Sequence, residues 1–170
     1  MKKEIRNISL ASIFSALSVA LIIVGTSFEL LDLSVAALCS ITVYISMVEI
    51  RGKYPLLIYA TVSVLSLIFM PMSTVSLYYI TFFGYYPIIR HKIKQKYKAI
   101  SVLICILIFN ITMVLTLLLF KTVFSLQNEP AFMYIILLIT ANIFFLCFDY
   151  ALNIFAFIYI KKIRTRLGLK

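Results

Sequence analysis

Six long apolar runs constrain this chain more than any other feature of its sequence. A helix needs about 20 apolar residues to cross a bilayer core of about 30 Å. Six runs approach or exceed that length, at residues 8–27, 31–50, 54–70, 73–89, 99–122 and 131–160. Lipid cannot pair with backbone amides and carbonyls, so the spanning segments must be helices or a closed barrel. We predict an all-α integral membrane protein, a single membrane domain over residues 1–170 built as a six-helix bundle.

Composition supports helices over a barrel and excludes a soluble domain. The chain has 170 residues, of which 64% are hydrophobic and only 13% charged, more apolar surface than a soluble core can hide. With 14 Phe and 11 Tyr but four Gly and four Pro, it favours long uninterrupted helices over a turn-rich structure. Pro55 and Pro130 stand where predicted spans begin, and Pro71 lies in the turn between runs three and four.

The basic residues predict the orientation of the spans. Runs 54–70 and 73–89 are short, so a fused or re-entrant pair is the alternative. With six spans and a cytoplasmic N-terminus, however, every Lys and Arg except Lys121 falls in a cytoplasmic segment, as the positive-inside rule requires. The outer loops then hold the acidic residues Glu29, Asp32 and Glu129. We therefore predict that both termini lie in the cytoplasm.

Few residues suit catalysis or metal binding. His91 is the only histidine and falls in a predicted cytoplasmic loop, so no buried Ser-His pair or HExxH site can form. No phosphate-binding loop occurs. Cys39, Cys105 and Cys147 lie far apart and are predicted to pack in the core. We expect no enzyme, cofactor or metal site, and we attribute the basic run 90–98 to orientation and anionic headgroups rather than nucleic acid, with a docking surface for a cytoplasmic partner left open.

The last run carries the most informative polar residues. Asn142, Asp149 and Asn153 recur at i, i+7 and i+11, which places them along one stripe of a helix. Asp149 is the only acid or base well inside a predicted span. It can be protonated, hydrogen-bonded by neighbouring Asn and Tyr groups, or matched by a cation. Intramembrane acids serve either function or helix association, and both readings stay open.

Other polar side chains suggest a cavity towards the outer side. Asn110 lies at a depth similar to that of Asn142 on the antiparallel neighbour, so the two face either a shared cavity or each other in a structural hydrogen bond. Tyr78 and Tyr79 enter run four from its outer end and line the cavity mouth or belong to an interfacial aromatic belt.

The first run has small residues on two nearly opposite faces. Ser9, Ser12, Ala16 and Ala20 share one face, and Ala11, Ser15 and Ser18 share the other. Small residues allow close helix approach, so one face suits a neighbour in the bundle and the other a separate membrane protein or another part of the same bundle.

The whole chain resembles the substrate-binding S components of energy-coupling-factor (ECF) transporters, and Ile50 to Tyr54 and Phe83 to Ile88 resemble uncharacterised Gram-positive versions. The resemblance lies in size, topology and the opening Ile8 to Val19, where the family carries an AxxxA motif. Here Ala16 to Ala20 matches that motif, and Ala11 to Ser15 and Ser12 to Ala16 are softened versions.

The resemblance implies a subunit in a bacterial cell membrane that captures a vitamin or similar micronutrient without catalysis. It implies as partners a transmembrane coupling subunit and two ATPase subunits, contacted through Ala11, Ser12, Ser15, Ala16 and Ala20. Substrate would bind near the outer side, under the loop from Thr26 to Asp32. The candidate binding residues are Glu29, Asp32, Tyr78, Tyr79, Asn110, Asn142 and Asp149. Two alternatives are a membrane scaffold similar to the cell-shape protein MreD and a secondary transporter driven by protons at Asp149.

Overall fold

The described part of the protein consists of helices joined by turns. The structure is a computed structural model, and it describes residues 2–27, 32–50, 52–71, 73–96, 100–123 and 131–163. The chain forms two compact units, Met1–Phe120 and Lys121–Lys170, which we describe separately.

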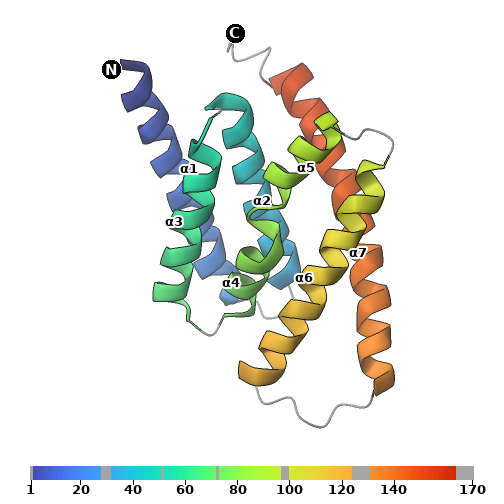
Figure 1. Cartoon of the computed structure of the whole chain (residues 1–170). Coiled ribbons are helices and arrows are strands. Elements are labelled where there is room, and N and C mark those ends of the chain that lie inside the picture. Colours follow the sequence, from blue (N-terminus) through green and yellow to red (C-terminus); the bar gives the residue numbers. More distant parts are fainter. Residues whose placement is uncertain are drawn as a thin grey trace. The chain divides into compact units, whose positions relative to one another are not determined.

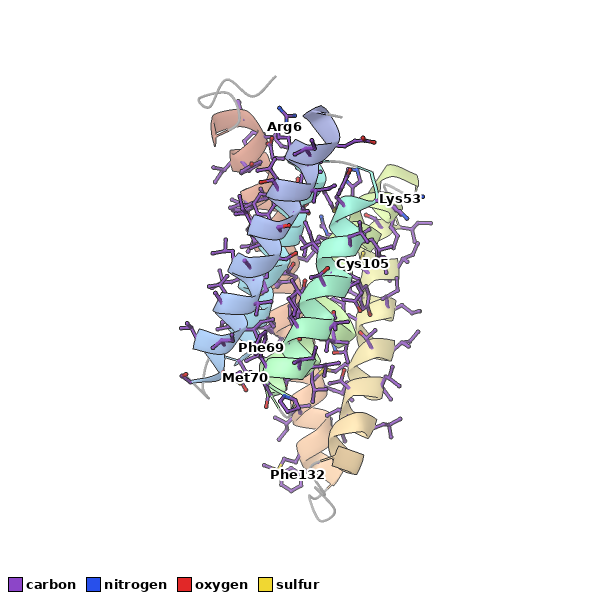
Figure 2. The ribbon with its side chains drawn as sticks, turned by 90° about the vertical axis from the view of Figure 1, so that its left-hand side faces the viewer. Arg6, Lys53, Phe69, Met70, Cys105 and Phe132 are labelled. Atoms are coloured by element: carbon purple, nitrogen blue, oxygen red, sulfur yellow. The ribbon has the colours of Figure 1, made fainter. Side chains whose placement is uncertain are left out.

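Three helices open unit 1: α1 (Lys2–Thr26), α2 (Asp32–Glu49) and α3 (Tyr54–Phe69). The first packs against both of the others, and the three run in alternating directions (Figure 1). Arg6 and Lys53 mark one end of this unit, and Phe69 and Met70 mark the other (Figure 2). The helices confirm the first three apolar runs, although α1 begins ahead of its predicted start because its basic first turns continue the helix.

Hydrogen bonds join α1 to α2 at their buried contact. The Ser18 and Thr42 hydroxyls bond each other, and Thr42 also donates to the Cys39 carbonyl at 2.7 Å. The Cys39 thiol donates to the Ser18 carbonyl at 3.6 Å. Further along, a Cβ on Gly25 would lie 2.5 Å from Val35, so glycine permits the close approach of the two helices. We call the Ser18, Cys39 and Thr42 contacts the α1–α2 polar contact.

The fourth predicted span is not one continuous helix. It comprises α4 (Thr74–Tyr78), a π-helical segment η2 (Tyr79–Phe83) and, after a turn, α5 (Tyr86–Lys96). Pro87 explains the break, because proline has no amide hydrogen and its ring clashes with the carbonyl four residues earlier. The chain widens to π spacing just before it, where the Gly84 amide donates to the Tyr79 carbonyl at 2.8 Å. The expectation of uninterrupted helices was wrong here.

Two further long helices complete the described fold. Helix α6 (Ser101–Val123) lies almost wholly in unit 1, and unit 2 contains α7 (Ala131–Ile158), which continues into a π-helical turn η3 (Tyr159–Ile163). Both agree with the predicted fifth and sixth runs. The predicted cytoplasmic loop after run four is helical up to Lys96, because α5 extends into the basic segment.

The apolar helices make this a multi-pass membrane protein. Among the described residues, α1, α2, α6 and α7 each contain a stretch long and apolar enough to cross a bilayer. Helix α3 is a shorter apolar helix of 16 residues, equivalent to about 24 Å at about 1.5 Å per residue. The six predicted spans thus correspond to four full-length helices, one short helix and one broken segment.

Candidate functional site

The break in the fourth span lies beside buried hydroxyl groups that lack hydrogen bonds. Ser40 on α2, Ser76 on α4 and Tyr79 on η2 are each 0% exposed. Within the described residues, none of these three hydroxyls has a hydrogen-bond partner. An unpaired buried hydroxyl costs about 1–3 kcal/mol. We call Ser40, Ser76 and Tyr79 the hydroxyl cluster.

Local geometry brings the cluster to one side of the broken span. Ser76 and Tyr79 are three residues apart, so they lie on the same helical face. Both α4 and η2 pack against α2, and Cys39, the neighbour of Ser40, lies near the Tyr79 side chain. Ser76 and Tyr79 therefore belong to the junction of α2 with the broken span, and Ser40 is a buried residue of the α2 helix that packs there, inside unit 1.

Aromatic rings form the other side of this junction. The Tyr59 hydroxyl on α3 donates to the Ile80 carbonyl at 2.9 Å, which supplies a partner for a carbonyl in the π-helical turn. Its ring centre lies 6.1 Å from that of Tyr79. A Cβ on Gly84 would lie 2.5 Å from the Tyr59 ring and 2.9 Å from the Tyr79 ring. Only glycine lets Tyr59 reach the break.

The buried hydroxyl of Ser63 also lacks a partner of acceptable geometry. It lies beside the Tyr59 hydroxyl, which is already bonded to Ile80, so we leave Ser63 out of the cluster.

The chemistry of the cluster favours a neutral polar ligand. A hydroxyl donates one hydrogen bond and accepts two, so three hydroxyls can pair with a carbonyl, amide or hydroxyl group. None of the three residues carries a formal charge, and the described residues contain no group of His, Cys, Asp and Glu arranged to hold a metal.

Among the predicted outer residues, the structure brings Tyr78, Tyr79 and Asp32 into one part of unit 1. Tyr79 belongs to the hydroxyl cluster and is fully buried, so it is not a residue of the interfacial belt. Tyr78 is partly exposed and lies near the Asp32 carboxylate. Glu29 and most of the predicted capping loop lie outside the described residues.

The intramembrane amides bond to their own helices. Asn110 donates to the Ile106 carbonyl at 2.9 Å, and Asn142 donates to the Leu138 carbonyl at 2.8 Å. Asn110 belongs to unit 1 and Asn142 to unit 2, so their shared cavity stays a prediction.

In unit 2, two residues of the predicted stripe on α7, Asp149 and Asn153, lie close to each other. Asp149 is 8% exposed, and its carboxylate oxygen Oδ2 lies 3.5 Å from the Asn153 amide. That amide donates more closely to the Asp149 backbone carbonyl, at 3.0 Å. Asp149 is thus hydrogen-bonded within its own helix, one of the states that its sequence allows.

The two small-residue faces of α1 differ in exposure. Ser15 and Ser18 are buried, and Ala11 is half-buried, so this face packs inside the protein. On the other face Ser12, Ala16 and Ala20 are exposed, and the Ser12 hydroxyl donates to the Ile8 carbonyl at 3.0 Å. The predicted partner residues therefore divide, and only Ser12, Ala16 and Ala20 remain on the outer surface.

Comparison with known proteins identifies no relative. No protein family, no curated protein and no solved structure matches this chain. The helices establish a multi-pass membrane protein, and any narrower function has to be argued from the residues themselves.

Sequence reasoning missed Ser40 and Ser76 because serines are common in membrane helices and their burial depends on packing. Pro87 was the available signal. A proline within an apolar run marks a kinked or broken helix, and polar groups beside such a break are candidates for a binding site.

Proposed function

We propose that this protein is a non-catalytic membrane subunit that captures a small solute for import. The observation that carries the proposal is the hydroxyl cluster, three buried and unpaired hydroxyls on α2 and on the broken fourth span that packs against it. In a membrane protein such groups have no bulk water to pair with, so a bound polar solute would recover their hydrogen bonds.

The broken span gives the cluster a means of opening. Irregular backbone is tolerated at membrane depth where it is buried or lines a cavity, and π-helical turns often occur at functional sites. Movement of α4 and η2 away from α2 would expose Ser76 and Tyr79 to a solute. The rings of Tyr59 and Tyr79 would provide apolar contact, which is typical of small-molecule pockets.

The proposed coupling is of the energy-coupling-factor kind, in which separate subunits hydrolyse ATP. The exposed small-residue face of α1, Ser12, Ala16 and Ala20, suits close packing with a transmembrane coupling subunit. In the proposed orientation both termini are cytoplasmic, so the end of unit 1 that carries Arg6 and Lys53 faces the cytoplasm. The solute would then enter from the end that carries Met70.

Native purification tests both parts of this proposal. The full chain is isolated in mild detergent from its own cells, and native mass spectrometry records bound small molecules and co-purified subunits. We expect one small neutral polar compound together with a coupling subunit and ATPases. Repeated recovery of the chain with neither, from cells that contain a coupling module, contradicts the proposal.

Two matched variants locate the solute. Tyr79→Phe removes a cluster hydroxyl and should weaken solute binding about 5- to 30-fold, because one hydrogen bond in a dry site contributes about 1–2 kcal/mol. Ser18→Ala removes a hydroxyl that is already bonded within the protein and should leave solute binding unchanged. Equal losses in both variants would indicate a general folding defect and place the solute elsewhere.

A further inference from the structure

Helix α5 carries a basic segment at the point where the fourth span ends. Its first residues are apolar and packed, with Tyr86 and Pro87 buried, and its sequence then becomes Arg90-His91-Lys92-Ile93-Lys94-Gln95-Lys96. No Asp or Glu occurs in this helix. The basic segment is therefore a continuous helical extension of a membrane-embedded element.

Contacts within unit 1 fix the start of this extension. The Arg90 side chain donates through Nε to the Tyr86 hydroxyl at 3.2 Å, and α5 packs against α2. Beyond it, the side chains of His91 and Lys92 are exposed. The helix is held at its apolar end, and Lys92 is exposed beyond that end.

The length of the basic segment matches the headgroup layer of a bilayer. From Arg90 to Lys96 the helix rises about 9 Å at about 1.5 Å per residue. The headgroup region on each side of a bilayer is about 5–8 Å thick. The segment follows directly on buried apolar residues, so a bilayer that covers those residues would bring its headgroups level with the basic end of α5.

Neighbouring elements add positive charge at the same end of unit 1. Arg6 and Lys53 are exposed and lie at the end where α1 and α3 begin (Figure 2). Helix α5 lies at this end as well (Figure 1). Two acids accompany them, Glu4 in the first turn of α1 and Glu49 in the last turn of α2. The described basic residues at this end outnumber the acids.

We propose that the basic end of α5 is a binding site for anionic phospholipid headgroups, with the exposed Lys92 contacting the lipid phosphates. Charge complementarity and depth select this occupant. The inference does not depend on solute capture, since it concerns a different element surface and a different ligand.

Lipid titration of the full-length protein tests the site. Purified protein in a neutral detergent is titrated with phosphatidylglycerol or with phosphatidylcholine, and bound lipid is measured by native mass spectrometry. We expect tighter binding of phosphatidylglycerol, weakened by added salt. Lys92→Gln/Lys94→Gln should weaken phosphatidylglycerol binding about 30-fold, because each basic residue near an anionic surface contributes about fivefold.

Two control variants separate this site from general attraction. Lys92→Arg/Lys94→Arg keeps the charge and should retain binding. Lys161→Gln/Lys162→Gln removes as much charge from η3, outside α5, and should weaken phosphatidylglycerol binding less than Lys92→Gln/Lys94→Gln does.

Three outcomes would overturn the proposal. The first is the absence of any preference for phosphatidylglycerol, as expected if the cations serve an acidic protein partner. The second is an equal loss of lipid in the two glutamine variants. The third is displacement of the lipid by inorganic phosphate at equal concentration. If a variant fails to fold, the salt dependence of phosphatidylglycerol binding to the wild-type protein still tests the proposal.

Discussion

The α1–α2 pair and the broken fourth span bury polar groups in opposite ways. In the α1–α2 polar contact, the hydroxyls of Ser18 and Thr42 bond each other and nearby carbonyls. At the break, Tyr79 and Ser76 are just as deeply buried and have no partner among the described residues. The first arrangement stabilises helix association. The second carries a cost that a bound ligand would relieve, which is why it is the candidate site.

The largest expected effect comes from removing the Tyr79 side chain. Tyr79→Ala would leave a cavity among α2, α3 and η2 and should lower the free energy of unfolding by about 3–5 kcal/mol, as for other buried aromatic residues. Thermal or denaturant unfolding in mild detergent measures this. A change below about 1 kcal/mol would show that the packing around the break is loose.

Substitution of Gly84, the glycine at the break, should lower the free energy of unfolding nearly as much. Gly84→Ala would force a methyl group into the Tyr59 and Tyr79 rings and should cost about 1–3 kcal/mol, as overpacking does elsewhere. The matched control is Gly52→Ala, at a position with φ of 75° and no atom within 4 Å of the added carbon. Its cost should be about 1 kcal/mol, from backbone conformation alone. Crosslinking of residue 59 to η2 should change only in Gly84→Ala.

Removing only the Tyr79 hydroxyl should raise the stability of the ligand-free protein instead of lowering it. Tyr79→Phe keeps the ring and eliminates an unpaired buried group, so the ligand-free protein should become more stable by about 1 kcal/mol. The measurement is unfolding after exhaustive removal of bound small molecules. Destabilisation in that state would mean that the hydroxyl has a partner in the folded protein.

The smallest effect is expected in the α1–α2 polar contact. Ser18→Ala should lower stability by about 0.6 kcal/mol, the average for hydrogen bonds between membrane helices. The opposite signs for Tyr79→Phe and Ser18→Ala, measured under the same conditions, would sharpen the contrast between the two regions. Changes of the same sign would remove it.

Much of the fold was predictable because apolar run length is a strong physical signal. The ranges of α2, α3, α6 and α7 follow from it closely. The interruption at Pro87 was not predicted, because the apolar run continues through it and hydropathy does not register a missing amide hydrogen. The basic end of α5 was assigned to a loop for a related reason, since charge predicts exposure but not the end of a helix.

The candidate site was predicted only through Tyr79. Ser40 and Ser76 lie on α2 and α4, and the spacing of residues in the sequence does not predict how these two helices pack together. The two faces of α1 were recognised from small-residue spacing, but their exposure had to come from the structure. Asn110, Asn142 and Asp149 were chosen by depth, and their hydrogen bonds within single helices neither establish nor remove a role in binding.

The hydrogen bond from Tyr59 to the Ile80 carbonyl has a mechanical consequence. Because it joins the middle of the broken span to a different helix, α4 and η2 cannot swing outward without either breaking that bond or carrying α3 with them. If the bond persists, the broken span and α3 would have to move together to admit a solute. If it breaks, the strength of this one hydrogen bond would set how often the site opens.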